Sequence, residues 1–204
     1  FKLGTLCFPS IVVAVFRKSS FTLDLKGYAM KVLAISGALR QGSLNTKLVR
    51  YAAQTFGAEF EIADLNLPLY SGDVENIGIP KCVQTLADQI KAADAVIIAT
   101  PEYNKNVSGV LKNALDWVSR THGNPWVRKP VAIMSATAGR SGGERAQNSL
   151  RLCLQPFIPR LLNGPEVLVG SAHEAFETGT LVNEKYQKAV AILMDALRTE
   201  VAMK

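Results

Sequence analysis

Small and polar residues gather in one short stretch of the chain, residues 36–45, which reads SGALRQGSLN. An apolar run precedes the stretch and a helical pattern follows it. A helix start attracts anions, because its first N–H groups are free and the helix dipole is positive there. Ser36, Ser43 and Asn45 add side-chain donors, and Arg40 adds a planar fork that matches phosphate. The stretch is therefore interpreted as a phosphate-binding loop.

Two other kinds of phosphate loop require a spacing that this stretch does not have. The dinucleotide fingerprint needs glycines at its first, third and sixth places, but Leu39 stands at the third place counted from Gly37. The nucleoside triphosphatase loop would match Gly37 and Gly42, yet Ser43 stands where its lysine is needed. A structural alternative stays open, in which the serine or asparagine only caps a helix and the arginine is solvated.

Two later loops carry residues suited to a flat ligand. In residues 100–104, TPEYN, Pro101 fixes the turn and Tyr103 offers an aromatic face, although an ordinary turn would read the same. In residues 135–143, SATAGRSGG, the glycines allow close backbone approach, and the amides can hydrogen-bond ring carbonyls. Arg140 is a candidate for a second phosphate, such as that of a nicotinamide nucleotide, or else a solvated surface residue.

Buried strands and amphipathic helices alternate along the chain and must position these loops. The predicted strands are residues 31–36, 59–63, 95–100, 129–134 and 166–169. Helical spacing of apolar residues predicts helices at residues 48–56, 80–94, 107–118, 146–161 and 186–201, the fourth broken near its end by Pro156 and Pro159. Residues 64–80 form a long loop, and long loops in compact domains are often functional.

Five strand-helix alternations predict a parallel sheet with helices on both faces. The natural candidate is an α/β, flavodoxin-like three-layer sandwich with a five-stranded parallel sheet of order 2-1-3-4-5. In such sheets ligands bind beyond the carboxyl ends of the strands, at the switch point of the strand order. The loops that follow the first, third and fourth strands are the three with unusual sequences, so the site is expected there.

The three motifs, in this order and spacing, resemble the NADPH-dependent FMN reductase family, which includes bacterial chromate, quinone and azo-dye reductases. The resemblance covers about residues 30–200. It implies that the first loop binds the FMN phosphate, that residues 101–104 flank the isoalloxazine ring and that residues 135–139 line its other edge. The residues assigned to the cofactor in this way are Ser36, Ala38, Arg40, Ser43, Leu44, Asn45, Pro101, Glu102, Tyr103, Asn104, Ser135, Ala136, Thr137 and Gly139.

One position departs from the family pattern. Ala38 stands where many members carry a serine. Losing that hydroxyl is expected to weaken phosphate binding by about 1 kcal/mol, the contribution of one hydrogen bond. The phosphate site should survive the change.

The expected activity is that of an NAD(P)H-dependent FMN/quinone reductase, in which the flavin carries the chemistry and no catalytic side chain is required. NADPH or NADH would donate a hydride in a two-electron ping-pong reaction, with quinones, chromate, azo compounds or free flavin as acceptors. Arg140 and Tyr103 are the candidates for contacting the nicotinamide or the substrate. The alternatives are a flavodoxin-type electron carrier, although such carriers are usually acidic, and a redox-sensing binding module.

Composition narrows the class of protein. The 204 residues fit a single domain, and their formal net charge of +6 comes from basic residues scattered among acids, which argues against nucleic-acid binding. Three cysteines and two histidines show no metal or cluster spacing, which indicates unpaired thiols in a reducing cytoplasm. Homodimers or homotetramers are usual in the resembled family, with FMN near the subunit interface.

Residues 1–29 stand apart from the patterned chain. They are mostly apolar and are followed by the first well-patterned strand, but the apolar run is too short to span a bilayer. We interpret them as upstream translation or a non-native leader, and residues 30–204 as the FMN-binding domain. No membrane association is expected.

Overall fold

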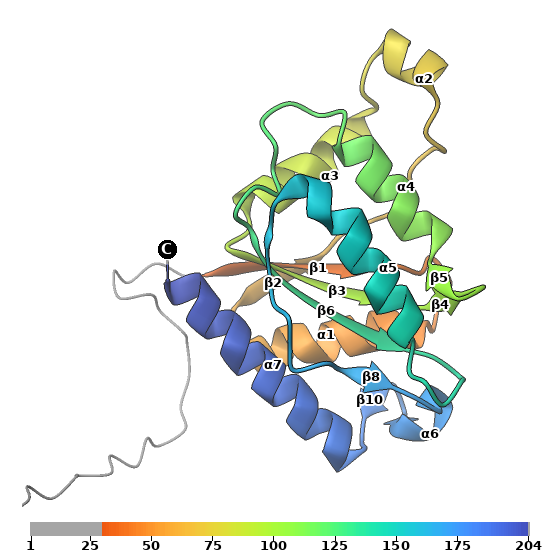
Figure 1. Ribbon diagram of the computed structural model, residues 1–204, viewed down its shortest axis with the longest axis vertical. Coiled ribbons are helices and arrows are strands. Elements are labelled where there is room, and N and C mark those ends of the chain that lie inside the picture. The colour runs from red at the N-terminus through yellow and green to blue at the C-terminus, as the bar shows by residue number, and fades with distance from the viewer. Residues whose placement is uncertain (1–29, 204) are drawn as a thin grey trace, which may run out of the picture.

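A computed structural model describes residues 30–203, which form three layers around a parallel sheet (Figure 1). The sheet contains β2 (Glu59–Ile62), β1 (Lys31–Ser36), β3 (Ala95–Thr100) and β6 (Pro130–Ala136) in that order. Each neighbouring pair is parallel, and β7 (Arg160–Leu161) and β8 (Leu168–Val169) extend the sheet beyond β6. The predicted flavodoxin-like order 2-1-3-4-5 is confirmed.

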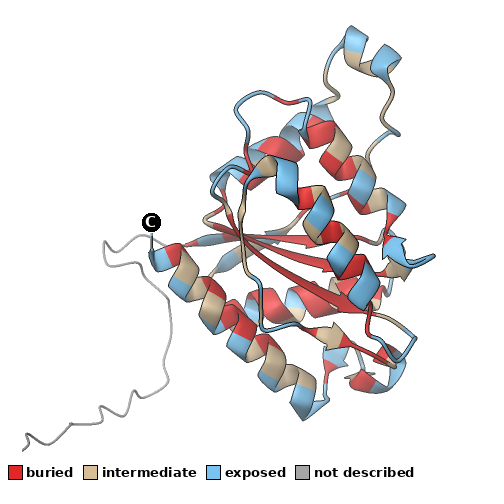
Figure 2. Ribbon diagram, viewed as in Figure 1, coloured by how far each residue is buried: buried red, intermediate tan, exposed pale blue. Residues whose placement is uncertain are grey.

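Helices cover both faces of the sheet because every central strand is apolar on both sides. On β1, Val32 and Ala34 face one hydrophobic cluster, whereas Leu33 and Ile35 face the other. The first face is covered by α1 (Leu44–Phe56) and α7 (Glu184–Ala202), and the second by α3 (Lys81–Ala92), α4 (Gly109–Val118) and α5 (Glu144–Leu154). Figure 2 shows the central strands buried and the outer faces of the helices exposed.

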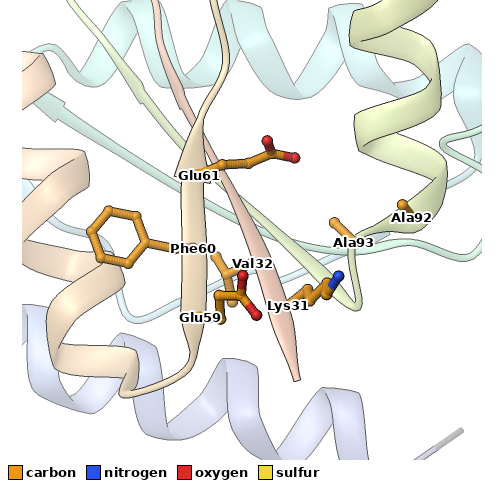
Figure 3. Close-up of a pocket in the computed structure, with 7 residues that line it drawn as sticks. All are labelled: Lys31, Val32, Glu59, Phe60, Glu61, Ala92 and Ala93. Atoms are coloured by element: carbon orange, nitrogen blue, oxygen red, sulfur yellow. The ribbon is translucent and has the colours of Figure 1, made fainter. Parts of the chain in front are cut away.

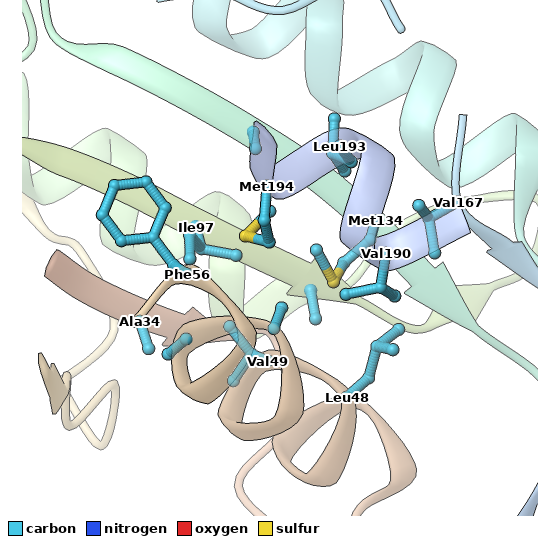
Figure 4. Close-up of a cluster of buried hydrophobic side chains, with 14 of the residues drawn as sticks. Ala34, Leu48, Val49, Phe56, Ile97, Met134, Val167, Val190, Leu193 and Met194 are labelled. Atoms are coloured by element: carbon cyan, nitrogen blue, oxygen red, sulfur yellow. The ribbon is translucent and has the colours of Figure 1, made fainter. Parts of the chain in front are cut away.

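The packing of α1 fixes where its first turn lies. Leu48, Val49 and Phe56 point from α1 into the same cluster as Val190 and Met194 of α7 (Figure 4). The helix ends at Gly57, whose φ of 82° is the left-handed conformation that glycine adopts without steric cost. Because this buried stripe holds the helix against β1 and β3, its amino end is held at the carboxyl edge of the sheet.

Two predicted elements differ in the structure. The predicted fifth strand, residues 166–169, is shorter in the structure, where only Leu168–Val169 (β8) pairs, with the second half of β6. The first half of β6 pairs instead with β7, which lies before the predicted range. Pro165 lies between β7 and β8 and has no N–H to give to a ladder. The helix predicted from residue 107 begins at residue 109, because β4 (Glu102–Tyr103) and β5 (Asn106–Val107) form an antiparallel hairpin.

Residues 64–80, which we call the arm, contain a helix that the sequence did not predict, α2 (Gly72–Ile77). The arm projects from the body of the molecule (Figure 1). Its base is held to α4: the Asn113 amide accepts a hydrogen bond from Tyr70 N at 2.9 Å and donates one to Pro68 O at 3.0 Å. Trp117 Nε1 donates to the same carbonyl at 2.8 Å. The base of the arm is therefore ordered.

The remaining short elements follow α5. They are a 3-10 turn (Gln155–Phe157), α6 (Ala172–Ala175), β9 (Phe176–Glu177) and β10 (Thr180–Leu181). Pro156 lies in the 3-10 turn, so α5 ends where the sequence predicted a break.

Residues 30–203 include no helix long and apolar enough to cross a membrane, and no group of three or more potential ligands that could hold a metal ion. Cys82 is exposed and Cys153 is half-buried against the core, both as free thiols. Cys7 and the leader proposed for residues 1–29 lie outside the described residues.

Candidate functional site

The loops that follow β1, β3 and β6 meet in one hollow of about 240 Å³. It lies at the carboxyl edge of the sheet, where the parallel topology predicts a ligand. All of its lining residues except Ala138 belong to the set predicted from the sequence. The lining consists of Ala38, Arg40, Ser43, Leu44, Asn45, Pro101, Glu102, Tyr103, Ala136, Thr137 and Ala138.

The first loop presents unused backbone donors. Ser43 is the N-cap of α1, and its hydroxyl accepts a hydrogen bond from Thr46 N at 3.4 Å. Within residues 30–203, the N–H groups of residues 38–42, 44 and 45 have no hydrogen-bond partner. The first turn of α1 carries no acidic residue. This arrangement suits an anion, because the free N–H groups and the helix dipole act together.

Arg40 adds charge to the same loop. Its side chain is exposed and makes no ion pair with any residue in the described range. It also lines a second hollow of about 270 Å³, which Ser36 and Thr46 line as well. The Ser36 hydroxyl is 2.7 Å from that of Thr46, and Ser36 does not line the first hollow. Its predicted phosphate contact stays a prediction.

Gly37 shows how closely the first and second loops pack. Its N–H donates to Ala99 O at 2.8 Å, the carbonyl next to the end of β3. A Cβ atom at this position would lie 2.9 Å from the Ser108 hydroxyl and 3.2 Å from Pro101 Cδ. A larger residue would therefore push the two loops apart.

The second loop is the hairpin of β4 and β5. Pro101 is buried, whereas Tyr103 is 55% exposed and lies on the wall of the hollow. The carboxylate of Glu102 accepts a hydrogen bond from Ala146 N at 3.2 Å, in the first turn of α5. Asn104 is at the exposed tip with φ 50° and does not line the hollow, so its predicted contact with the ring stays a prediction.

The third loop, residues 136–143, packs tightly at its two ends and is open in the middle. At its base, Ser135 is fully buried and its hydroxyl donates to Gly142 O at 2.5 Å. A Cβ atom on Gly143 would lie 2.8 Å from the Ser135 side chain. Gly139 has open space around it, and within residues 30–203 the N–H groups of residues 138–141 have no partner. These amides are available to a ligand.

Asn45 lines the hollow, yet both ends of its amide are already paired. Its Nδ2 donates to Ala136 O at 2.8 Å, and its Oδ1 accepts from Ala136 N at 2.9 Å. The side chain is 3% exposed. In this structure Asn45 thus joins the first turn of α1 to the end of β6, and its predicted role at the phosphate stays a prediction.

Gln147 is a buried residue near the site that was not predicted from the sequence. This residue is 1% exposed, and its Nε2 donates to Ser135 Oγ at 2.8 Å and to Val167 O at 2.9 Å. The available signal was a polar residue in helical register with Leu150 and Leu154 in the buried stripe of α5. The position of Gln147 in the sequence does not reveal its hydrogen-bond partners, because Ser135 and Val167 belong to other parts of the chain.

Arg140 lies on a separate hollow of about 250 Å³, next to the third loop. It is exposed and has no ion-pair partner within residues 30–203. Ser171, Asn183 and Tyr186 line the same hollow with Glu174. Arg140 therefore stands outside the first hollow, and its predicted contact with the nicotinamide nucleotide or substrate stays a prediction.

A different hollow, of about 140 Å³, lies at the amino edge of the sheet (Figure 3). Lys31, Glu59 and Glu61 line it together with the end of α3. Lys31 is the first residue of β1, so this hollow is at the opposite end of that strand from Ser36. Its two carboxylates oppose an anionic ligand, and it is separate from the predicted site.

The first hollow fits FMN in its chemistry. Free amides, a helix start and Arg40 offer an anion site, and the exposed Tyr103 together with the open amides of residues 138–141 offers contacts for a flat polar ring. Small residues at 38, 136 and 138 leave the space between the loops open. These protein donors suit a ligand in which a phosphate is joined to an aromatic ring.

Comparison with known proteins gives three findings. The family described as NADPH-dependent FMN reductase matches residues 30–174. An NAD(P)H-dependent FMN reductase of Pseudomonas aeruginosa is 44% identical over 173 residues, which cover 83% of this chain and 94% of the relative. A quinone reductase of Escherichia coli is 38% identical over 162 residues, or 76% of this chain and 86% of the relative.

Among solved structures, FerB, a flavoenzyme NAD(P)H:(acceptor) oxidoreductase from Paracoccus denitrificans, superposes with a TM-score of 0.78 at 32% sequence identity. The match covers 85% of this chain and 98% of FerB.

Proposed function

Because the chain belongs to the NADPH-dependent FMN reductase family, we propose that it binds FMN in the hollow between its three loops and acts as an NAD(P)H-dependent FMN/quinone reductase. The observation that carries the assignment of the site is the set of unused N–H groups in the first loop, at the start of α1 and beside Arg40. It lies where a flavodoxin-like sheet places its ligand.

Different residues would bind different parts of the cofactor. Arg40, Ser43 and the amides of the first loop would hold the phosphate through charge-assisted hydrogen bonds. Pro101 and Tyr103 would flank the ring, and Thr137 and the backbone of the third loop would bind its polar edge. Bound FMN would supply the two-electron hydride chemistry that links NAD(P)H to an acceptor.

The chain's own contribution is binding, orientation and electrostatics. The open amides of residues 138–141 are fixed dipoles that favour negative charge on a bound ring. Tyr103, 55% exposed, gives a planar surface against which one flat reactant at a time can bind, which suits alternation between donor and acceptor. No side chain is required to exchange a proton with the reactants in this scheme.

The finer features of the function are also proposals. Arg140 would contact the phosphate of the nicotinamide nucleotide; quinones, chromate, azo compounds or free flavin would be the acceptors. The protein would act in the cytoplasm as a homodimer or homotetramer. The apolar side chains exposed on the arm, Leu69 and Ile77, support self-association.

Substitution of Arg40 tests the phosphate site. Arg40→Ala should weaken FMN binding about 10- to 100-fold, because it removes hydrogen bonds to a charged group. Riboflavin, which lacks the phosphate, should bind both proteins equally. Apo-protein would be titrated with each flavin, and binding followed by quenching of flavin fluorescence. Arg50→Ala, an exposed arginine of α1 outside the hollow, is the control.

An equal affinity of Arg40→Ala and the unaltered protein for FMN would refute the phosphate role of Arg40. The enzymatic assignment has its own readout. The FMN-loaded protein should oxidise NADH or NADPH with benzoquinone and without a partner reductase. A flavodoxin-type carrier would need such a partner. If NAD(P)H bleaches the bound flavin only after a partner reductase is added, that alternative is favoured.

A further inference from the structure

Two buried amides converge on the base of the third loop from different helices. Asn45, in the first turn of α1, pairs with both backbone groups of Ala136. Gln147, in α5, donates to Ser135 Oγ and to Val167 O. Ala136 and Ser135 are consecutive residues at the end of β6, so the loop that leaves this strand is held from both sides of the sheet.

Asn45 has little capacity left for a ligand. An asparagine amide has two donor hydrogens and one acceptor oxygen. One donor and the oxygen are engaged by Ala136 across 91 positions of sequence, and the side chain is 3% exposed although the hollow beside it is open. A side chain directed at a phosphate in that hollow would instead present its free donors to it.

Gln147 has a buried polar atom that destabilises the folded protein, and its position in the core does not explain why this atom is there. Its Oε1 is buried and has no hydrogen-bond partner within residues 30–203. An unsatisfied buried polar atom in a native structure requires a reason. The two bonds of its Nε2 group supply one, because they fix the Ser135 hydroxyl, which in turn donates to Gly142 O at the far end of the loop.

The bonds form one continuous connection around the third loop. Asn45 holds its first residue, Ser135 joins its base to Gly142, and Gln147 holds Ser135. Between these fixed ends, the N–H groups of residues 138–141 are free. The two ends of this segment are therefore fixed by residues other than those that carry the free N–H groups.

We propose that Asn45 and Gln147 are positioning residues that hold the third loop in the shape that receives the flavin ring, and that Asn45 acts through Ala136 rather than on the phosphate. The inference rests on the proposed FMN site. It predicts that phosphate binding and ring binding depend on different residues. Asn45 would serve ring binding although it lies in the phosphate loop.

Two flavins separate these roles, because riboflavin has the ring without the phosphate. Asn45→Ala should weaken FMN and riboflavin binding by the same factor, about tenfold for the loss of two hydrogen bonds. Arg40→Ala should weaken FMN binding alone. The visible circular dichroism of the bound flavin should change in Asn45→Ala, since the ring's surroundings move, and should be unchanged in Arg40→Ala.

Asn113→Ala is the matched control. Asn113 also joins a helix to a distant backbone segment through one accepted and one donated hydrogen bond. It holds the arm, however, and neither Asn113 nor its partners line the flavin hollow. Asn113→Ala should lower the Tm of the apo-protein without changing the affinity for either flavin. If it weakens flavin binding as much as Asn45→Ala does, the effect is general destabilisation and the inference fails.

Gln147→Met is the second test and serves if Asn45→Ala does not fold. Methionine keeps the approximate length of the side chain, removes both donated bonds and also removes the unsatisfied oxygen. It should lower the affinity for both flavins equally while the Tm of the apo-protein changes little. An unchanged affinity for both flavins would overturn the role of Gln147.

The outcomes distinguish the inference from the function it rests on. If the unaltered apo-protein binds neither flavin, the proposed function is wrong and the inference with it. If the unaltered protein binds both flavins and Asn45→Ala weakens FMN binding only, the FMN site stands, Asn45 contacts the phosphate and the positioning role is refuted.

Discussion

Arg140 and Arg40 are both exposed arginines without an ion-pair partner within residues 30–203, but they line different hollows. Arg40 lies at the start of α1, where the helix and the free amides add to its charge. Arg140 lies on the third loop, beside Ser171 and Tyr186. A guanidinium binds a phosphate through a planar fork of donors, so a second phosphate-bearing molecule can be recognised without competing for the first site.

The proposed role of Arg140 predicts a change in donor preference. Arg140→Ala should lower kcat/KM for NADPH about tenfold, because a charge-assisted contact to the extra phosphate of NADPH is lost. The value for NADH should change little. Steady-state rates with benzoquinone as the acceptor give both values, with Arg50→Ala as the control. Equal losses with NADH and NADPH would place Arg140 away from that phosphate.

At the scale of elements, the base of the arm is a polar and aromatic cluster on α4. Tyr70 Oη donates to Glu75 Oε2 at 2.8 Å, and its ring packs edge-on against Trp117 with centroids 5.1 Å apart. Arg120 lies over the same ring, 5.2 Å from its centroid. The hydrogen bond to Glu75 is the main reason that the pKa of Tyr70 is raised above its ordinary value of 10.0, with burial adding to it.

This raised pKa predicts how the arm's stability depends on pH. A raised folded-state pKa means that the neutral phenol is favoured in the folded protein. The stabilisation is complete below pH 10 and is lost as the pH rises through the folded-state pKa. The stability difference between the unaltered protein and Tyr70→Phe should therefore be smaller at pH 11 than at pH 8 in urea unfolding.

Tyr51→Phe provides the comparison for this measurement, because the Tyr51 hydroxyl has no hydrogen-bond partner within residues 30–203. It measures the effect of removing a tyrosine hydroxyl that makes no such hydrogen bond. A difference for Tyr70→Phe that is equally large at pH 8 and pH 11 would contradict the link to Glu75. Flavin affinity should be unchanged in both variants.

At the scale of the whole molecule, the tip of the arm projects from the body (Figure 1). Its helix α2 has no buried residue, and Leu69 and Ile77 are 82% and 91% exposed. Figure 2 shows α2 as exposed and intermediate in colour. Apolar side chains on a projecting element are favourable sites for contact with another surface, since contact removes their area from water.

The proposed self-association predicts a measurable change in mass. Light scattering after size-exclusion chromatography should give two or four times the mass of one chain. The double variant Leu69→Lys and Ile77→Lys should shift this mass toward the single chain, because two charges would enter the contact. Matched substitutions on α5 and α7, Leu152→Lys with Ile192→Lys, replace exposed apolar residues elsewhere. If the arm variant keeps the mass of the unaltered protein, the arm is excluded as the contact.

The sequence by itself determined the layers, the strand order and the edge of the sheet where the three loops meet. Continuous apolar runs are required of strands buried on both faces, and apolar stripes at helical spacing are required of the helices that cover them. The loop after each strand could therefore be located from the chain alone. Most of the predicted loop residues do line the hollow, because parallel strands bring their carboxyl ends to one edge.

Only the tertiary structure decided what individual side chains do there. Asn45 reads as a phosphate donor in sequence, but its partner Ala136 is 91 residues away. Glu102, in the second loop, is engaged by the first turn of α5, and Gln147 was not identified. Hydrogen bonds between elements depend on how helices pack across the sheet, and no local pattern encodes that distance. Residue types therefore locate the candidate site, whereas packing determines which of its side chains are already paired within the protein.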